Sequence, residues 1–209
     1  MHANRFRADG LSELVTILVG PSKTKFTVHK KLACEASPVL NAAFNSSFVE
    51  GQTQEYALTD TTEGAVSLFT EWMYTGNIVL VLPQDANDPK VPTTQGDLLG
   101  LWILADKLLV PRLQNRALLL FEGSRVKHNH IHMGQLMNAW TNTGDGCGLR
   151  RYLTNIIVRL LPKEVYKKHQ QYFTKDMLLD VAFLVKDILD VGGKISQFPA
   201  IETFYVEVD

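Results

Sequence analysis

Residues 1–80 are divided into short segments that each carry their own turn or cap, and this limits the chain to a fold of small elements. An apolar, β-branched run covers Leu14 to Val19, and Gly20 to Lys23 supply turn residues after it. From Lys25 to Val28 polar and apolar residues alternate. The pattern predicts two antiparallel strands joined by a short loop.

Two short helices are expected directly after these strands. The first covers His29 to about Glu35. The second begins at Ser37, whose hydroxyl can accept a hydrogen bond from an unpaired amide, and Pro38 suits the first helical position because no donor is needed there. The apolar residues that share one face of this helix are Leu40, Ala43 and Phe44.

A third strand and a longer helix follow. The strand is expected from Glu55 to Thr59, and Asp60 to Glu63 resembles a capping box with an acidic residue in place of Ser or Thr. Gly76 is suited to end the helix, because glycine adopts the left-handed conformation without strain. The apolar stripe of this helix consists of Val66, Phe69 and Met73.

The middle of the chain is less regular. The apolar run from Ile78 to Leu82 predicts a buried strand. Pro83 to Gly96 predicts an exposed loop, because it holds three prolines among polar residues and glycine. Two strongly apolar helices are then expected, from Asp97 to Leu109 and from Arg112 to Phe121, with Pro111 between them.

The last third of the chain predicts helices alone. Apolar residues recur at helical spacing from Leu153 to Leu161 and from Met177 to Leu189. A loop that contains three glycines, Thr141 to Gly148, precedes the first of these helices, and Gly192 follows the second. The tail from Ile195 to Asp209 shows no pattern that assigns a structure.

Composition excludes several classes of function. The 209 residues carry a net charge of −1, so no broad basic field is available to bind nucleic acid. The N-terminal residues lack the apolar core of a signal peptide, and the most apolar stretch, Leu98 to Ala105, is too short to cross a bilayer. Cys34 and Cys147 match no zinc or redox spacing, which favours two free thiols. A location in the cytoplasm or the nucleus is therefore expected.

Six phrases in a fixed order carry a resemblance to a known family. They are the strand pair, Val28 to Leu32, Ser37 to Leu40, Phe48 to Gly51, Trp72 to Gly76, and Leu101 to Leu113. Together these phrases resemble the BTB/POZ domain, and those around Phe48 to Thr53 and Ala105 to Lys107 are most similar to members from filamentous fungi.

The resemblance implies an α+β fold, in which a small mixed sheet flanks a cluster of helices. We expect the BTB/POZ domain over residues 12–123, an all-α extension over 124–194 and a tail over 195–209. The expected core residues are Ile17, Val28, Leu40, Phe44, Phe69 and Leu104.

The family acts by binding protein partners and often a second copy of the same chain. The resemblance therefore implies a protein-interaction module that self-associates as a homodimer and recruits partners, with no enzymatic activity and no cofactor. Two alternatives remain open: a substrate adaptor of a cullin–RING ubiquitin ligase, which would bind a cullin, and a transcriptional regulator. The second is weak, because the chain has no zinc-finger spacing and no basic region.

The expected self-association surface lies in the first third of the chain. In many BTB dimers a lysine at the position of Lys30 joins a charged pocket with an acidic residue of the first strand, and Glu13 is the nearest candidate here. Asp9 and Gly10 break any exchanged N-terminal helix, so we expect the dimer to use residues 29–45. The residues assigned to this surface are Glu13, His29, Lys30, Cys34, Leu40, Asn41 and Phe44.

A second surface is expected near the end of the helix over residues 63–75. Cullin adaptors carry a hydrophobic-x-Glu tripeptide in this helix, and Phe69 to Glu71 has that composition. It lies about one turn late, or about 5 Å along the helix, because Val66 to Leu68 stands at the usual spacing. The residues assigned to partner binding are Leu68, Phe69, Glu71 and Tyr74.

Three other features are interpreted as structural. His128, His130 and His132 resemble a metal-binding stretch, but no further ligand lies at a suitable spacing, so a solvated loop or helix start is expected. His29 lacks an identifiable nucleophile or carboxylate partner, which favours a hydrogen-bonded structural role. Cys34 is expected to be a small packed residue.

Overall fold

The computed structural model describes residues 12–80 and 90–208. Three strands form one mixed sheet in the order β2-β1-β3, with β1 over Leu14–Val19, β2 over Thr24–His29 and β3 over Glu55–Leu58. The first two strands are antiparallel, as the sequence predicts, and β3 lies parallel to β1. Alternate residues of β1 are buried, so one face of the sheet packs against helices.

Four helices accompany this sheet: α1 Lys30–Ala36, α2 Pro38–Phe44, α3 Val49–Thr53 and α4 Glu63–Thr75. The predicted cap of α2 is confirmed, because the Ser37 hydroxyl accepts a hydrogen bond from the amide of Leu40 at 3.2 Å. The cap of α4 is Thr62 and lies two residues later than the predicted capping box begins. Gly76 ends α4 with a φ of 70°, as predicted.

The predicted strand over residues 78–82 is wrong for the residues that the structure describes. Residues 78–80 form no strand, and residues 81–82 lie outside the described chain. Side chains satisfy the backbone here in place of a neighbouring strand: Glu71 Oε1 accepts from the Val79 amide at 2.9 Å, and Arg116 donates to the Ile78 carbonyl at 3.4 Å. Only the apolar side chain of Ile78 is buried.

Helix α5, Lys90–Lys107, begins inside the predicted loop over residues 83–96. Residues 83–89 of that loop lie outside the described chain. Proline is tolerated in the first turn of a helix, because the amides there have no intrahelical acceptor, so Pro92 does not prevent the earlier start. Helix α6, Pro111–His128, begins at the predicted break and continues past residue 123.

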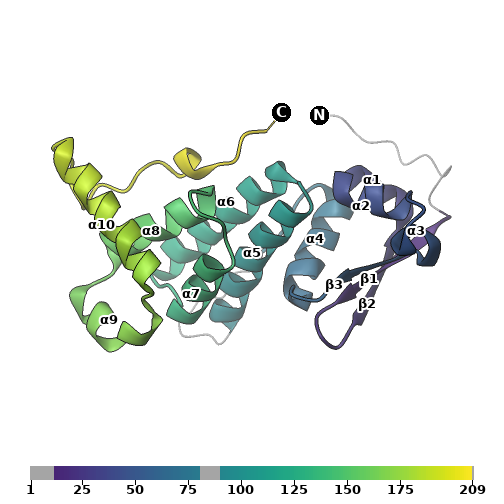
Figure 1. Ribbon diagram of the computed structural model, residues 1–209, viewed down its shortest axis with the longest axis horizontal. Helices are drawn as coiled ribbons and strands as arrows, with labels where there is room; N and C mark the ends of the chain where they lie inside the picture. Colours follow the sequence, from purple (N-terminus) through teal and green to yellow (C-terminus); the bar gives the residue numbers. More distant parts are fainter. Residues whose placement is uncertain (1–11, 81–89, 209) are drawn as a thin grey trace.

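The second half is helical, as predicted. It contains α7 Met133–Thr141, α8 Gly148–Leu160, α9 Lys163–Lys168, the 3-10 turn η1 Gln170–Tyr172 and α10 Lys175–Asp190. Figure 1 shows an elongated molecule with the sheet and α1 to α3 at one end and α9 and α10 at the other. No helix in the described ranges is both long and apolar enough to span a membrane.

The tail folds back along the helices, which the sequence did not reveal. A 3-10 turn, η2 Ile201–Phe204, packs on α8 and buries Phe204. Beyond it, Val206 exchanges two hydrogen bonds of 2.8 Å with the side chain of Asn115 in α6. Arg159 in α8 donates to three carbonyls of the chain between α10 and η2. The tail therefore connects the end of the chain to both α8 and α6.

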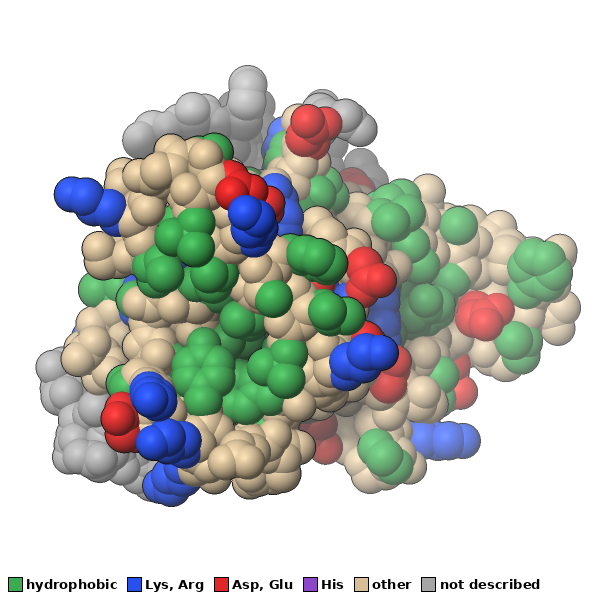
Figure 2. All heavy atoms as spheres, turned by 60° about the vertical axis from the view of Figure 1, so that its left-hand side comes forward, with side chains coloured by type: hydrophobic (Ala, Val, Ile, Leu, Met, Phe, Trp, Pro, Cys, Tyr) green, Lys and Arg blue, Asp and Glu red, His purple; other side chains and the backbone are tan. Residues whose placement is uncertain are grey.

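The core is continuous through both halves. All six predicted core residues, from Ile17 to Leu104, are buried, and they form one cluster with residues of α6, α7 and α8. Apolar side chains also remain outside this core at the far end. Figure 2 shows hydrophobic side chains gathered on the face that carries the last helices, and the large exposed ones of α10 are Leu178, Leu179, Phe183 and Leu189.

Candidate functional site

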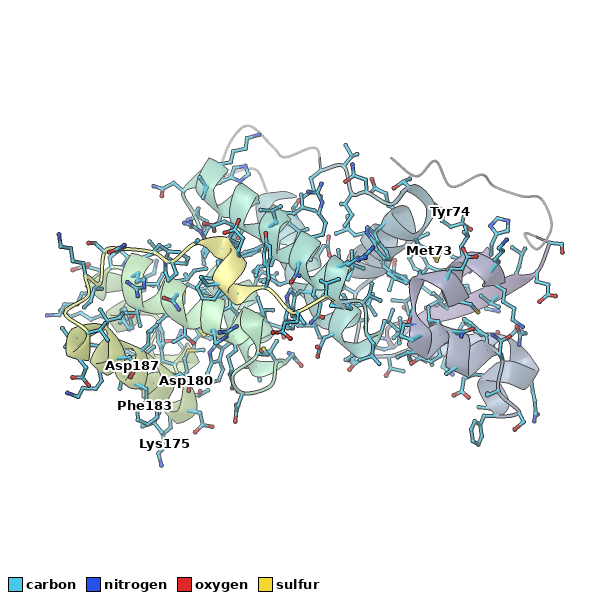
Figure 3. All side chains as sticks on the ribbon, turned by 90° about the horizontal axis from the view of Figure 1, so that it is seen from above. Met73, Tyr74, Lys175, Asp180, Phe183 and Asp187 are labelled. Atoms are coloured by element: carbon cyan, nitrogen blue, oxygen red, sulfur yellow. The ribbon has the colours of Figure 1, made fainter. Side chains whose placement is uncertain are left out.

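His29 and Tyr74 join the two predicted surfaces. The Tyr74 hydroxyl accepts a hydrogen bond from the His29 amide at 3.1 Å and lies 2.7 Å from His29 Nδ1. Which of the two groups donates in the contact with Nδ1 depends on the imidazole tautomer, because the hydroxyl oxygen can also accept a second hydrogen bond. Figure 3 shows Tyr74 near the end of α4, and α4 packs on α1. The predicted hydrogen-bonded role of His29 is confirmed by these contacts.

Lys30 and Glu13 are brought together within one chain. Lys30 Nζ lies 3.6 Å from Glu13 Oε2, and the Lys30 amide donates to the Glu13 carbonyl at 2.9 Å. The Lys30 side chain is only 20% exposed, whereas the Glu13 side chain is 72% exposed. The lysine is therefore held in place by its surroundings, and the carboxylate is available to a second molecule.

Cys34 and Asn41 lie on the adjoining helices α1 and α2. The Asn45 side chain donates to Cys34 Sγ at 3.7 Å and to Asn41 Oδ1 at 2.8 Å, so the three residues form one polar group. Burial raises the pKa of the Cys34 thiol above its ordinary value, with smaller and opposing effects from Lys30 and Asn45. The thiol is thus kept protonated, which fits a packed residue and not a nucleophile.

Leu40 and Phe44 of α2 lie in the core beneath this surface. Both side chains are fully buried in the chain, and the Phe44 ring meets the Tyr56 ring edge-on at a centroid distance of 6.3 Å. They therefore offer no exposed area to a partner and act by fixing α2 against β3. The accessible part of the predicted set consists of Glu13, His29, Lys30, Cys34 and Asn41.

The residues predicted for partner binding on α4 are likewise divided between the core and the surface. Phe69 is buried and stacks on Trp72 at a centroid distance of 6.4 Å, so it belongs to the core. Glu71 is partly buried and uses one carboxylate oxygen to hold the Val79 amide. Leu68 and Tyr74 remain partly exposed on α4.

The sequence analysis assigned no binding role to two strongly exposed apolar residues, Phe48 and Val49. Phe48 is 74% exposed and Val49 is 62% exposed, at the start of α3. Helix α3 packs on α2, so both side chains lie beside the predicted self-association surface. An aromatic and a β-branched residue in succession, directly after the polar residues Ser46 and Ser47, could have marked this site in the sequence.

The sequence comparison fits this geometry. Residues 4–118, more than half of the chain, match the sequence profile of the BTB/POZ domain. The chain belongs to the BTB/POZ domain family. The BTB/POZ domain is a protein–protein interaction module, and the helices that follow it here form a C-terminal extension. A search of curated proteins finds no match to this BTB/POZ protein, and the fungal likeness stays a sequence prediction.

His128, His130 and His132 do not form a metal site in the described structure. His128 is buried in the last turn of α6, where Nδ1 lies 2.8 Å from the Ser124 carbonyl, so the predicted solvated segment is wrong for this residue. His130 and His132 follow in the connection to α7, with ring centroids 4.7 Å apart. Across the two described ranges no three residues of metal-binding type are clustered.

Proposed function

We propose that the BTB/POZ domain, over residues 12–123, self-associates as a homodimer and recruits a protein partner, and that residues 124–194 form a rigid extension of that module. Two observations carry this proposal: the exposure of Phe48 and Val49 at the start of α3, and the charged pair of Lys30 and Glu13 at the start of α1. Exposed aromatic residues next to fixed polar groups are typical of protein interfaces, whose cores are enriched in aromatic side chains.

The arrangement of the helices supports one continuous surface. Helix α1 packs on α2 and α2 packs on α3, and all three lie at the same end of the molecule (Figure 1). The accessible polar residues of the predicted set and the exposed Phe48 therefore belong to one run of packed helices. An apolar centre with a polar rim is the usual anatomy of an interface.

Charge reversal tests the homodimer. Light scattering of the unchanged chain is expected to give a dimer in the high micromolar range. Lys30→Glu should weaken that dimer, because the new carboxylate would then meet the exposed Glu13 carboxylate of the second chain. Adding Glu13→Lys should restore the dimer. Lys186→Glu, at an exposed ion pair of α10, is the matched control and should leave the mass unchanged. A monomer at every concentration would reject self-association.

A role as a cullin adaptor is the second candidate. It is supported by the packed extension, because the family resemblance implies that adaptors use such helices to complete the cullin contact. Phe69 is interior and Glu71 holds Val79, so the contact would use the partly exposed Leu68 and Tyr74. Calorimetry against a cullin N-terminal domain tests it: heat that is lost on Leu68→Arg but kept on Ser67→Arg supports the role, and no heat at micromolar concentration ends it.

A further inference from the structure

A polar groove of about 580 Å³ lies where the BTB/POZ domain meets the extension. Helix α5 forms one wall, α7 forms the other, and the residues before α4 close one side. The two helices pack against each other, as Figure 1 shows. The volume falls within the range of ordinary ligand sites. Since none of the accessible residues of the proposed self-association surface lines this groove, it calls for a separate account.

The α5 wall contains two glycines that lie close to neighbouring helices. Gly96, Gly100, Ile103 and Lys107 share one face of the helix and line the groove over about 16 Å, at 1.5 Å per residue. A Cβ at Gly96 would lie 2.6 Å from Gln135 Oε1, and one at Gly100 would lie 3.3 Å from the Ala65 Cβ. Glycine at these two positions therefore allows α5 to lie close to Gln135 of α7 and to Ala65 of α4. The length of the groove matches about five residues of an extended chain, at about 3.3 Å each.

The α7 wall carries side-chain amides. Gln135, Asn138 and Asn142 follow one another at helical spacing and all line the groove. An amide side chain offers both a donor and an acceptor, which suits the alternating N–H and C=O groups of an extended peptide backbone. Asn142 already donates to Asn138 Oδ1 at 3.0 Å, so this wall is ordered before any ligand binds.

One carboxylate in the groove lacks a cation. Asp60 is paired with Lys107 at one end. Asp97 accepts a hydrogen bond of 3.4 Å from the Thr62 hydroxyl, and among the side chains that the structure describes it forms no salt bridge. It rests against the first turn of α4, where a Cβ at Gly64 would collide with its carboxylate. The groove is therefore left with one uncompensated negative charge.

Two other classes of ligand fit less well. A hard cation such as Ca²⁺ or Mg²⁺ needs about six oxygen ligands, and the described residues here supply one unpaired carboxylate and neutral amides. An anion would need a free positive group, but Lys107, the one cation among the described lining residues, is bound to Asp60. The remaining class is an organic cation that also presents polar backbone groups.

We propose that the groove between α5 and α7 binds an extended segment of a partner protein and takes one of its arginine or lysine side chains onto Asp97. The aliphatic part of that side chain would lie along Ile103, and the amides of Gln135 and Asn138 would hold the segment's backbone. This proposal rests on one part of the proposed function, the recruitment of a protein partner, and it states which side chain of that partner would bind.

A tripeptide probe tests the proposal on the full chain. The capped peptides acetyl-Ala-Arg-Ala-amide and acetyl-Ala-norleucine-Ala-amide differ in the charged group, and nuclear magnetic resonance titration of the labelled protein reports weak binding. The arginine peptide should shift the amide signals of Gly96, Gly100 and Asn138, and the norleucine peptide should bind at least about tenfold more weakly. Asp97→Asn should reduce arginine binding by about the same factor, because a charge-assisted hydrogen bond is lost.

The controls keep this result separate from folding and from self-association. Asp97→Asn preserves shape, and its melting temperature shows whether the variant is folded; Asp187→Asn on α10 is the matched change outside the groove and should bind normally. Equal binding of both peptides, signal shifts outside the groove, or arginine binding unaffected by Asp97→Asn would overturn the proposal. A monomeric chain that binds the arginine peptide would reject the homodimer alone, and a dimer that binds neither peptide would reject the groove alone.

Discussion

At the scale of single residues, the Tyr74 hydroxyl connects the two predicted surfaces, because it forms hydrogen bonds with both the amide and the ring of His29. Tyr74→Phe should lower the free energy of unfolding by about 1–2 kcal/mol, since a partly buried amide and a ring nitrogen lose their partner. Chemical denaturation measures this difference. Tyr172→Phe, at an exposed tyrosine, is the control, and an equal effect of both changes would show that the link contributes nothing.

Asp97 and Asp60 should respond to pH with opposite signs. Burial raises the pKa of Asp97 above 3.8, and the hydrogen bond from Thr62 offsets this only in part. The ionised form of Asp97 is thus disfavoured in the folded chain, and stability is lost as the pH rises through the raised pKa. Asp97→Asn should therefore raise the unfolding temperature at pH 7, and this gain should disappear at pH values below about 3.8.

Asp60 supplies the matched comparison. The hydrogen bond from Lys107 lowers the pKa of its carboxyl below 3.8, so the pair adds stability above that pH and loses it as the pH falls through the lowered pKa. Asp60→Asn should lower the unfolding temperature at pH 7, by a small amount because both side chains are exposed to solvent. Shifts of the same sign for Asp60→Asn and Asp97→Asn would contradict this assignment of charges.

At the scale of elements, the packing of the C-terminal tail on α8 can be tested by mutation. The Tyr152 ring in α8 meets the rings of Phe198 and Phe204 edge-on, at centroid distances of 5.9 Å and 5.4 Å. Phe204→Ala should cost about 3 kcal/mol of stability, because it removes a buried aromatic side chain from this group. Val191→Ala, at an exposed position after α10, should cost almost nothing. Equal unfolding midpoints for the two variants would show that the tail is not part of the core.

Elements with local signals could be predicted from the sequence. The β1–β2 pair, the Ser37 cap and the end of α4 at Gly76 each depend on residues within a few positions of one another. The resemblance added the order of these elements and placed Lys30 near Glu13, which the ion pair within the chain matches.

Other features depend on partners far along the chain and could not be predicted. Glu71 and Arg116 hold the segment over residues 78–80, and neither is adjacent to it in sequence. Asn115 and Arg159 hold the tail, and both are more than 30 residues away from it. The exposure of Phe48 and Val49 was missed because two successive apolar residues give no helical or strand periodicity that indicates which side faces solvent. The groove was missed because its walls come from two helices whose contact no local pattern indicates.

At the scale of the whole molecule, two exposed apolar regions lie at opposite ends of an elongated chain (Figure 1). One lies at Phe48 in the BTB/POZ domain. The other is on α10, where the exposed Phe183 lies between Asp180 and Asp187 and lines a pocket with residues of α8 (Figure 3). The proposed function assigns self-association to the first region. Because either region has the composition of an interface, the central claim depends on which of them is covered when two chains meet.

Hydrogen exchange followed by mass spectrometry over a concentration series decides this directly. As the concentration of the chain rises from low to high micromolar, amide exchange should slow in the peptides that cover residues 29–45 and the start of α3, because a second copy excludes solvent from them. Exchange in α10 should stay unchanged. Exchange rates that do not depend on concentration in any peptide, or rates that fall only in α10, would contradict the assignment of self-association to the BTB/POZ surface.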